Sequence, residues 1–247
     1  MKKAILVRVG IDQSDKSGNW NAPVDPDTGA FAYVPILEDE GNGKKPIRHG
    51  YKVSYKQFKK PCKNLGKELH QKFLKKGKFA HLDPDFKYLT YGDESRKKKR
   101  LESFHLDKGD ILAFYAGLRP PHAGSCDLIY ALIGLYVLEK PGVTALDDIP
   151  QKDWRKNAHT RREYIKDDDI IFSGTKDGKS GRLKRYIPIG EYRPNGYYLK
   201  TAIQKKWGEP EEVCLQHGYL PKLSDPDRFY DWFKEQGIPL VPQNNLD

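Results

Sequence analysis

Two uncharged stretches, separated by a short polar loop, constrain the fold of this chain more than any other feature. Residues 111–116 read ILAFYA and residues 128–138 read LIYALIGLYVL, without a charged side chain in either. Strands that lack a polar face must be buried on both sides, and the loop 117–127 is too short for a helical crossover. We therefore predict adjacent antiparallel strands in the centre of a curved sheet, where Gly134 permits a close backbone approach.

The rest of the chain indicates an α+β fold. Short apolar runs that end in turn residues predict further strands at 4–10, 31–37 and 170–172. Apolar side chains at helical spacing predict helices at 64–76, 197–207 and 227–236. The expected architecture is a mixed, curved β-sheet or a small PUA-like barrel with a few flanking helices. We expect a single α+β domain over residues 1–247, with a polar loop insertion at about 38–63 and a C-terminal helical part at about 197–236.

The chain is strongly basic, with 44 Lys and Arg against 34 Asp and Glu and a formal net charge of +10. A basic balance favours polyanionic partners, because lysine and arginine release counterions when they neutralise phosphates. We therefore expect a nucleic acid or nucleotide as partner, with DNA favoured. A basic surface without such a partner is the alternative, since excess lysine also occurs on thermophile proteins.

Several classes of protein are disfavoured by what the sequence lacks. Its first apolar stretch is too short for a signal peptide and no run is long enough for a membrane span, so we expect a cytoplasmic protein with no membrane partner. The three cysteines lie far apart without a CxxC pair, which excludes a cysteine zinc knuckle and disfavours a disulfide framework. The GxxxxGK[ST] loop, the GxGxxG motif after a strand and the zinc-deaminase signature are also missing.

The segment His81-Leu-Asp83-Pro-Asp85 is the first candidate site. In an extended segment, side chains two residues apart share one face, so the three polar groups are expected on the same side. A histidine with two carboxylates can transfer protons or hold a divalent metal ion. The alternative is a turn whose carboxylates accept hydrogen bonds from backbone amides.

Two further groups of residues are candidates for binding a nucleotide. Arg8, Asp12 and Ser14 follow the first predicted strand, where Arg8 can bind phosphate through two hydrogen bonds and Ser14 can add a donor. A structural ion pair of Arg8 is the alternative. His159, with Asn157 before it and two arginines after it, is the second group, and a surface histidine is its alternative.

Basic and aromatic side chains along the chain suggest how a nucleic acid is held. A single strand or a flipped base needs basic residues along its phosphates and aromatic rings that stack on its bases. The candidates for phosphate contacts are Arg119, Lys97, Lys98, Lys99 and Arg100. The candidate stacking rings are Tyr115 and Trp154. For the basic run at 96–100, an ordinary solvated face is the alternative.

Four short motifs, taken in order, give the chain a resemblance to a known family. They are Arg8-Val-Gly-Ile-Asp12-Gln-Ser14 with Tyr33-Val-Pro-Ile36, His81-Leu-Asp-Pro-Asp85, the Lys108-Gly-Asp110 turn with its two strands, and Asn157-Ala-His159. The chain resembles the nucleotide modification associated domain family, third type, over roughly residues 4 to 233. It departs from the pattern in the lysine-rich segment 44–63 and at Ala116-Gly117. The hairpin is also similar to the core of PUA-like folds such as the EVE and ASCH domains.

The resemblance implies a protein that acts on or binds a nucleobase, and two hypotheses follow. In the first, an enzyme, Arg8 binds phosphate, His81 or Asp83 transfers a proton and Asp85 orients the site. These residues then converge with Asp12 on one cavity. In the second, a non-catalytic reader of the PUA or EVE type stacks a modified base on aromatic rings. The sequence indicates no particular base, cofactor, metal or oligomeric state.

Overall fold

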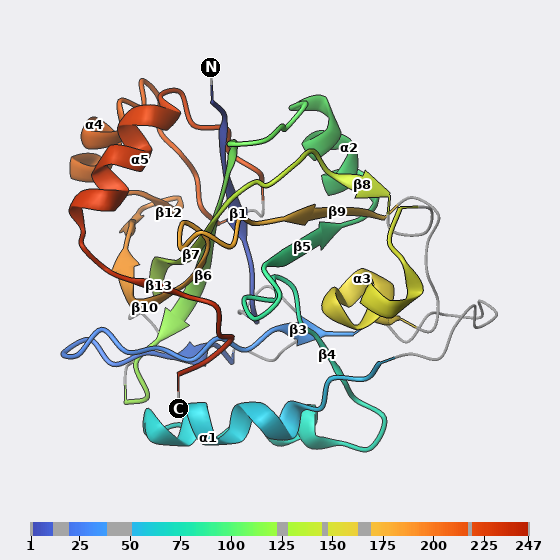
Figure 1. Cartoon of the computed structure of the whole chain (residues 1–247). Coiled ribbons are helices and arrows are strands. Elements are labelled where there is room, and N and C mark those ends of the chain that lie inside the picture. The colour runs from blue at the N-terminus through green and yellow to red at the C-terminus, as the bar shows by residue number, and fades with distance from the viewer. Residues whose placement is uncertain are drawn as a thin grey trace.

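A mixed β-sheet lies at the centre of the molecule, in a computed structural model that describes residues 2–11, 20–38, 51–122, 128–144, 148–162, 169–216 and 219–246 (Figure 1). Its strands run in the order β1-β6-β7-β10-β13, and β2 also pairs with β6. Their bounds are β1 Ala4–Arg8, β2 Ala22–Pro23, β6 Ile111–Arg119, β7 Ile129–Val137, β10 Gly181–Pro188 and β13 Leu240–Val241. The sheet is open, because the described residues of β1 and β13 do not pair with each other. The mixed-sheet prediction is confirmed and the barrel alternative is wrong.

The central hairpin agrees with its prediction. β6 and β7 are antiparallel, with Ile111 opposite Val137 and Leu118 opposite Ile129. A Cβ atom on Gly134 would lie 2.3 Å from the Phe86 ring and 2.7 Å from a backbone oxygen of β10, so only glycine fits there. The pair is central, since β1 runs parallel to β6 on one side and β10 antiparallel to β7 on the other.

Both faces of the sheet are covered by apolar side chains, as uncharged strands require. Leu112 and Phe114 point into one core, with the aromatic rings of the segments before β6. Ala113 and Tyr115 belong to the other core, together with side chains of two helices. Both helices lie on the same side of the sheet (Figure 1). These helices are α4 Thr201–Trp207 and α5 Pro226–Glu235. The second is capped at its N-terminus by Asp225, whose side chain accepts a hydrogen bond from a backbone N–H of the first turn.

A smaller three-stranded sheet, in the order β5-β9-β8, positions the candidate site. Its strands are β5 Thr90–Asp93, β9 Ile170–Ser173 and β8 Val143–Thr144, and a two-stranded ribbon of β3 Ile36–Leu37 and β4 Ala80–His81 lies nearby. The helical segments are η1 Tyr55–Phe58, α1 Lys59–Asn64, η2 Gln71–Leu74, α2 Ser95–Ser103, η3 Gln151–Lys156 and α3 Ala158–Arg161. A second ribbon consists of β11 Gly190–Arg193 and β12 Gly196–Leu199.

The segment after β13 fastens two distant loops. Asn245 accepts a hydrogen bond from the backbone N–H of Tyr33 and donates one to its carbonyl, at 2.8 and 2.9 Å. Asn244 accepts from the backbone N–H of Phe86 at 2.8 Å and donates to the Asp85 carboxylate at 3.1 Å. The C-terminal residues therefore hold the turn that follows the first candidate site.

Several predicted elements are wrong. In place of a helix at 64–76, α1 ends at Asn64 and η2 starts at Gln71, because Gly66 between them has a positive φ of 71°. The predicted loop at 38–63 contains η1 and most of α1 within its described part. Only 36–37 of the predicted strand at 31–37 is a strand, and the start of the helix predicted at 197–207 is β12. The strand at 170–172 is real, but it belongs to the smaller sheet.

Candidate functional site

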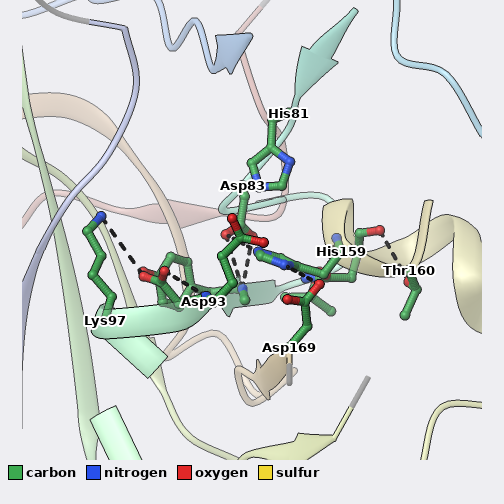
Figure 2. Close-up of polar contacts among 12 residues, drawn as sticks. His81, Asp83, Asp93, Lys97, His159, Thr160 and Asp169 are labelled. Carbon is green, nitrogen blue, oxygen red and sulfur yellow. Dashed lines mark hydrogen bonds and ion pairs between the residues drawn. The ribbon is translucent and has the colours of Figure 1, made fainter. Parts of the chain in front are cut away.

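Four polar side chains from three segments of the chain meet beside β5 (Figure 2). His81 ends β4, Asp83 follows it by two residues, His159 lies in α3 and Asp169 directly precedes β9. We call these four residues the histidine–aspartate cluster. Their side chains are almost fully buried, with exposed fractions of 7% for His81, 5% for Asp83, 2% for His159 and 0% for Asp169.

His159 lies between the two aspartates. Its Nδ1 atom is 3.0 Å from Asp169 Oδ2, and its Nε2 atom is 3.6 Å from Asp83 Oδ2. The ring of His81 meets that of His159 edge to face, with ring centroids 4.9 Å apart. Burial disfavours the charged form of His159, but the two carboxylates outweigh it and raise the pKa of the imidazole to about 9.

A glycine on β5 allows this arrangement. The backbone N–H of Gly92 donates to both oxygens of Asp83, at 3.0 and 3.1 Å. A Cβ atom on Gly92 would lie 2.3 Å from Cδ2 of His159, far inside van der Waals contact. Gly92 therefore both fixes the Asp83 carboxylate and makes room for the imidazole.

An outer layer of charged residues surrounds the cluster. Glu38 Oε2 lies 3.0 Å from Nδ1 of His81, and Arg162 donates to Glu38 at 3.0 Å and to Glu94 at 2.7 Å. Burial alone would raise the pKa of Glu38, but His81, Arg162 and His159 lower it to about 2. The side chains of Glu38 and Glu94 are 21% and 26% exposed, so the cluster is nearest to solvent on their side.

The basic run extends from this outer layer. It lies on α2, which begins two residues after Asp93, and Lys97 Nζ is 4.0 Å from Asp93 Oδ2 (Figure 2). Burial raises the pKa of Asp93, although Lys97 and a hydrogen bond from Tyr91 oppose the shift. Lys98 is 3.4 Å from Glu102 on the same helix. Lys99 and Arg100 are exposed.

Asp85 does not share a face with His81 and Asp83, contrary to the prediction for an extended segment. Its carboxylate is buried, pairs with Arg161, and accepts from the backbone N–H groups of Lys87 and Tyr88 at 3.0 and 3.3 Å. This is the turn described by the alternative hypothesis, in which carboxylates accept from backbone amides. Asp83 also accepts from an amide, but in addition it faces His159.

Of the three residues predicted as a binding group around the first strand, the structure describes Arg8. Arg8 donates to the Tyr130 hydroxyl at 2.9 Å and to the carbonyl of Gln216. Asp12 and Ser14 lie outside the described residues, so the convergence of Asp12 with His81 and the role of Ser14 as a donor stay predictions. Tyr115 is fully buried and its hydroxyl donates to a backbone carbonyl at 3.0 Å, so its ring packs in the core, with no face open to a base.

The remaining predicted residues flank α3 or end β6. Asn157 caps α3 by accepting from the backbone N–H of His159 at 2.8 Å, and it lines a cavity of about 230 Å³ with Lys156 and Lys176. Trp154 is half-buried and donates to the carbonyl of Ile149 at 3.0 Å. Arg119 is half-buried at the end of β6. His159 is buried, so its alternative as a surface residue is wrong.

Sequence reasoning missed Glu38, Glu94 and Asp169 and gave Arg162 no role of its own. One sequence feature could have identified Asp169, because this residue is the last of three aspartates directly before a predicted buried strand. An acidic side chain at such a strand start points to a nearby partner. No such feature marks Glu38 or Glu94, since their partner Arg162 is far away in the sequence.

Within the described part of the chain, two overlapping sets of residues could hold a metal ion. His81, Asp83 and His159 form one set, and Glu94, His159 and Asp169 form the other. In each set, one ligand atom from every residue lies within 4.8 Å of the other two.

Among the described residues, no helix is both long and apolar enough to cross a membrane.

The fold and site define an α+β protein with an open mixed sheet and a buried cluster of titratable residues beside it. The sequence model of the family described as nucleotide modification associated domain 3 matches residues 3–209. The chain therefore belongs to this family, which confirms the resemblance found from its motifs. The matched range contains the whole histidine–aspartate cluster. Neither the curated proteins nor the solved structures include a match to the chain.

Proposed function

We propose that the chain is an enzyme that modifies a nucleobase, free or within a nucleic acid, and that the histidine–aspartate cluster carries the chemistry. The observation behind this is the burial of two imidazoles and two carboxylates in mutual contact. Removing such groups from water costs several kcal/mol unless they are compensated, and clusters of this kind are typical of active sites. The family description supports a role associated with nucleotide modification.

The basic helix α2 supports a phosphate-bearing substrate. Its first turn follows Glu94 at the solvent side of the cluster, and Lys97, Lys99 and Arg100 are exposed on it. Positive charge at the rim of a buried site attracts an anionic substrate and raises its local concentration. A nucleotide whose phosphate contacts α2 would place its base towards the cluster.

The reader hypothesis receives less support. A reader binds a base by stacking it on an exposed ring, and Tyr115 is buried in the core. A reader also has no need for buried carboxylates around a histidine. It remains one of the outcomes of the experiment.

The test is mass spectrometry of nucleosides from bacteria that produce the protein. Total DNA, RNA and the free nucleotide pool are compared for the natural sequence, Asp83→Asn, and the surface control Asp177→Asn. We expect a mass-shifted nucleoside with the natural sequence and the control, and its loss in Asp83→Asn. That substitution keeps an oxygen that accepts from Gly92 while it removes the charge.

Two results would contradict the proposal. The first is a set of nucleosides identical to that of cells without the protein, combined with tight binding of a modified oligonucleotide. If the purified natural protein and its Asp83→Asn variant both bind in this way, the protein is a reader. Identical nucleosides without binding of nucleotides or DNA at low salt would exclude both functions. In that case the basic surface would have no nucleic-acid partner.

A further inference from the structure

We infer that His81, Asp83 and His159 bind one divalent transition-metal ion. This deepens the proposed function, because it places the ion in the same site, and it depends on that proposal only for what the ion is used for. The binding itself is a property of three side chains and their supporting contacts, and it can be measured without a substrate.

Each of the two histidines has one nitrogen held by a carboxylate. Nδ1 of His81 lies 3.0 Å from Glu38, and Nδ1 of His159 lies 3.0 Å from Asp169. Metal-binding histidines nearly always have such a partner on the nitrogen that does not coordinate, because it sets the ring orientation and makes the other nitrogen a better ligand. In both residues this leaves Nε2 as the coordinating atom.

The distance between Asp83 and His159 fits an ion between them. Their closest recorded atoms, Oδ2 and Nε2, are 3.6 Å apart, which is beyond the 2.7–3.2 Å range of hydrogen bonds. Two ligands placed at about 2.1 Å from a tetrahedral ion are separated by about 3.4 Å. His81 completes the set, since one nitrogen of its ring lies within 4.8 Å of a ligand atom of Asp83 and of His159. Figure 2 shows the His81 and His159 side chains on two sides of Asp83.

A buried oxygen next to the site gives independent support. Oδ1 of Asp169 has no hydrogen-bond partner among the residues that the structure describes, and the Asp169 side chain is fully buried. Asp83, Asp169 and Glu38 bring three carboxylates to the two imidazoles, while Arg162 is the guanidinium beside them. An excess of buried negative charge is costly, and a bound divalent cation compensates it.

Arg162 also decides between the two possible ligand sets. Its Nη1 atom lies 2.7 Å from Glu94 and 3.5 Å from Asp169, so a permanent positive charge already stands between these two carboxylates. A metal ion bound by Glu94, Asp169 and His159 would be repelled at short range. In the set with His81 and Asp83, Arg162 lies 3.5 Å from Nδ1 of His81, the nitrogen that does not coordinate, and Asp169 stays the partner of His159.

The ligand types determine the class of metal. Two imidazole nitrogens and one carboxylate oxygen suit Zn²⁺, Fe²⁺ or Co²⁺, whereas Mg²⁺ and Ca²⁺ prefer oxygen ligands. Three protein ligands leave at least one position open for water or for an atom of the substrate. The site therefore has the ligand number of a reactive centre.

The experiment measures metal binding by the full chain after treatment with a chelator. Zn²⁺ is titrated by calorimetry, and Co²⁺ is titrated by its visible absorption, which reports coordination by nitrogen and oxygen. We expect one ion per chain and a metal-dependent rise in melting temperature. His81→Gln and Asp83→Asn should weaken binding by about a hundredfold or more, and Glu38→Gln by about ten- to a hundredfold. The surface variant His105→Gln is the matched control and should bind as the natural sequence does.

Absence of a saturable site with one ion per chain in the natural sequence would overturn the inference. So would equal affinities of His81→Gln and His105→Gln, because metal would then bind only to scattered surface groups. If the ligand variants do not fold, the Glu38→Gln affinity decides, since this residue lies at the exposed edge. Metal binding without any modified nucleoside would count against the proposed function alone. A modified nucleoside made by protein that binds no metal would count against the metal site alone.

Discussion

Replacing Gly92 by alanine tests whether the site is built on the contact between β5 and His159. The new Cβ atom would lie 2.3 Å from Cδ2 of the imidazole and 3.0 Å from its Cγ and Nε2. Carbon atoms in contact are normally about 3.5–4.0 Å apart, so the ring must retreat by more than about 1 Å. His159 is buried and its Nδ1 atom lies only 3.0 Å from Asp169, so the ring cannot retreat without displacing that carboxylate or rotating out of the hydrogen bond.

The expected cost is that of an overpacked core, about 1–3 kcal/mol in the free energy of unfolding. For a chain of this size, each kcal/mol lowers the melting temperature by roughly 2–4 °C. Calorimetry or guanidinium denaturation, both with chelator present, measures the loss without any contribution from bound metal.

A double-mutant cycle separates this clash from other effects of alanine on the strand. The substitution is repeated in a His159→Ala background, which has no side-chain atom at the positions of Cγ and Cδ2. There the cost of Gly92→Ala should fall by at least about 1 kcal/mol, because residues in contact are coupled and the ring is gone. Equal costs in both backgrounds would refute the view that Gly92 makes room for the imidazole.

Three further predictions concern other parts of the molecule. Burial raises the pKa of the Cys62 thiol to about 12, so iodoacetamide at pH 8 should modify it only after denaturation, as peptide mass spectrometry would show; modification of the folded protein would contradict this. Asp85→Ala leaves Arg161 buried without its carboxylate and should lower the free energy of unfolding by about 3–5 kcal/mol in urea denaturation, and a loss below about 1 kcal/mol would rule this out. Alanine at all four positions from Lys97 to Arg100 should weaken DNA binding and flatten its dependence on salt, measured by fluorescence anisotropy; unchanged affinity would make the run an ordinary solvated face.

The central hairpin could be predicted because its information is local. Each strand of the pair is an uninterrupted apolar run, so burial on both faces follows from composition alone. The helix predicted at 64–76 is wrong, because local spacing shows which side chains are buried and does not show where the backbone changes direction. Leu69 and Phe73 are buried as their spacing indicated, but Gly66 ends the helical conformation before them. Spacing thus indicated which side chains are buried better than it indicated the backbone conformation.

The site could be predicted only in part, because its contacts join residues far apart in the sequence. His81, Asp83 and His159 were each found from their local motifs. Their meeting depends on the pairing of β5 with β9, which no local pattern specifies. Asp85 looked equivalent to Asp83 in sequence, yet Asp85 pairs with Arg161 and stabilises a turn.

The asparagines that follow β13 have a consequence for how the protein is made. β13 is the last strand of the central sheet in chain order, and the family match ends well before it, at residue 209. During synthesis, the edge of β10 and the turn at Asp85 therefore remain unpaired until these later residues have left the ribosome. The final packing around Tyr33 and Asp85 forms only once Asn244 and Asn245 have emerged.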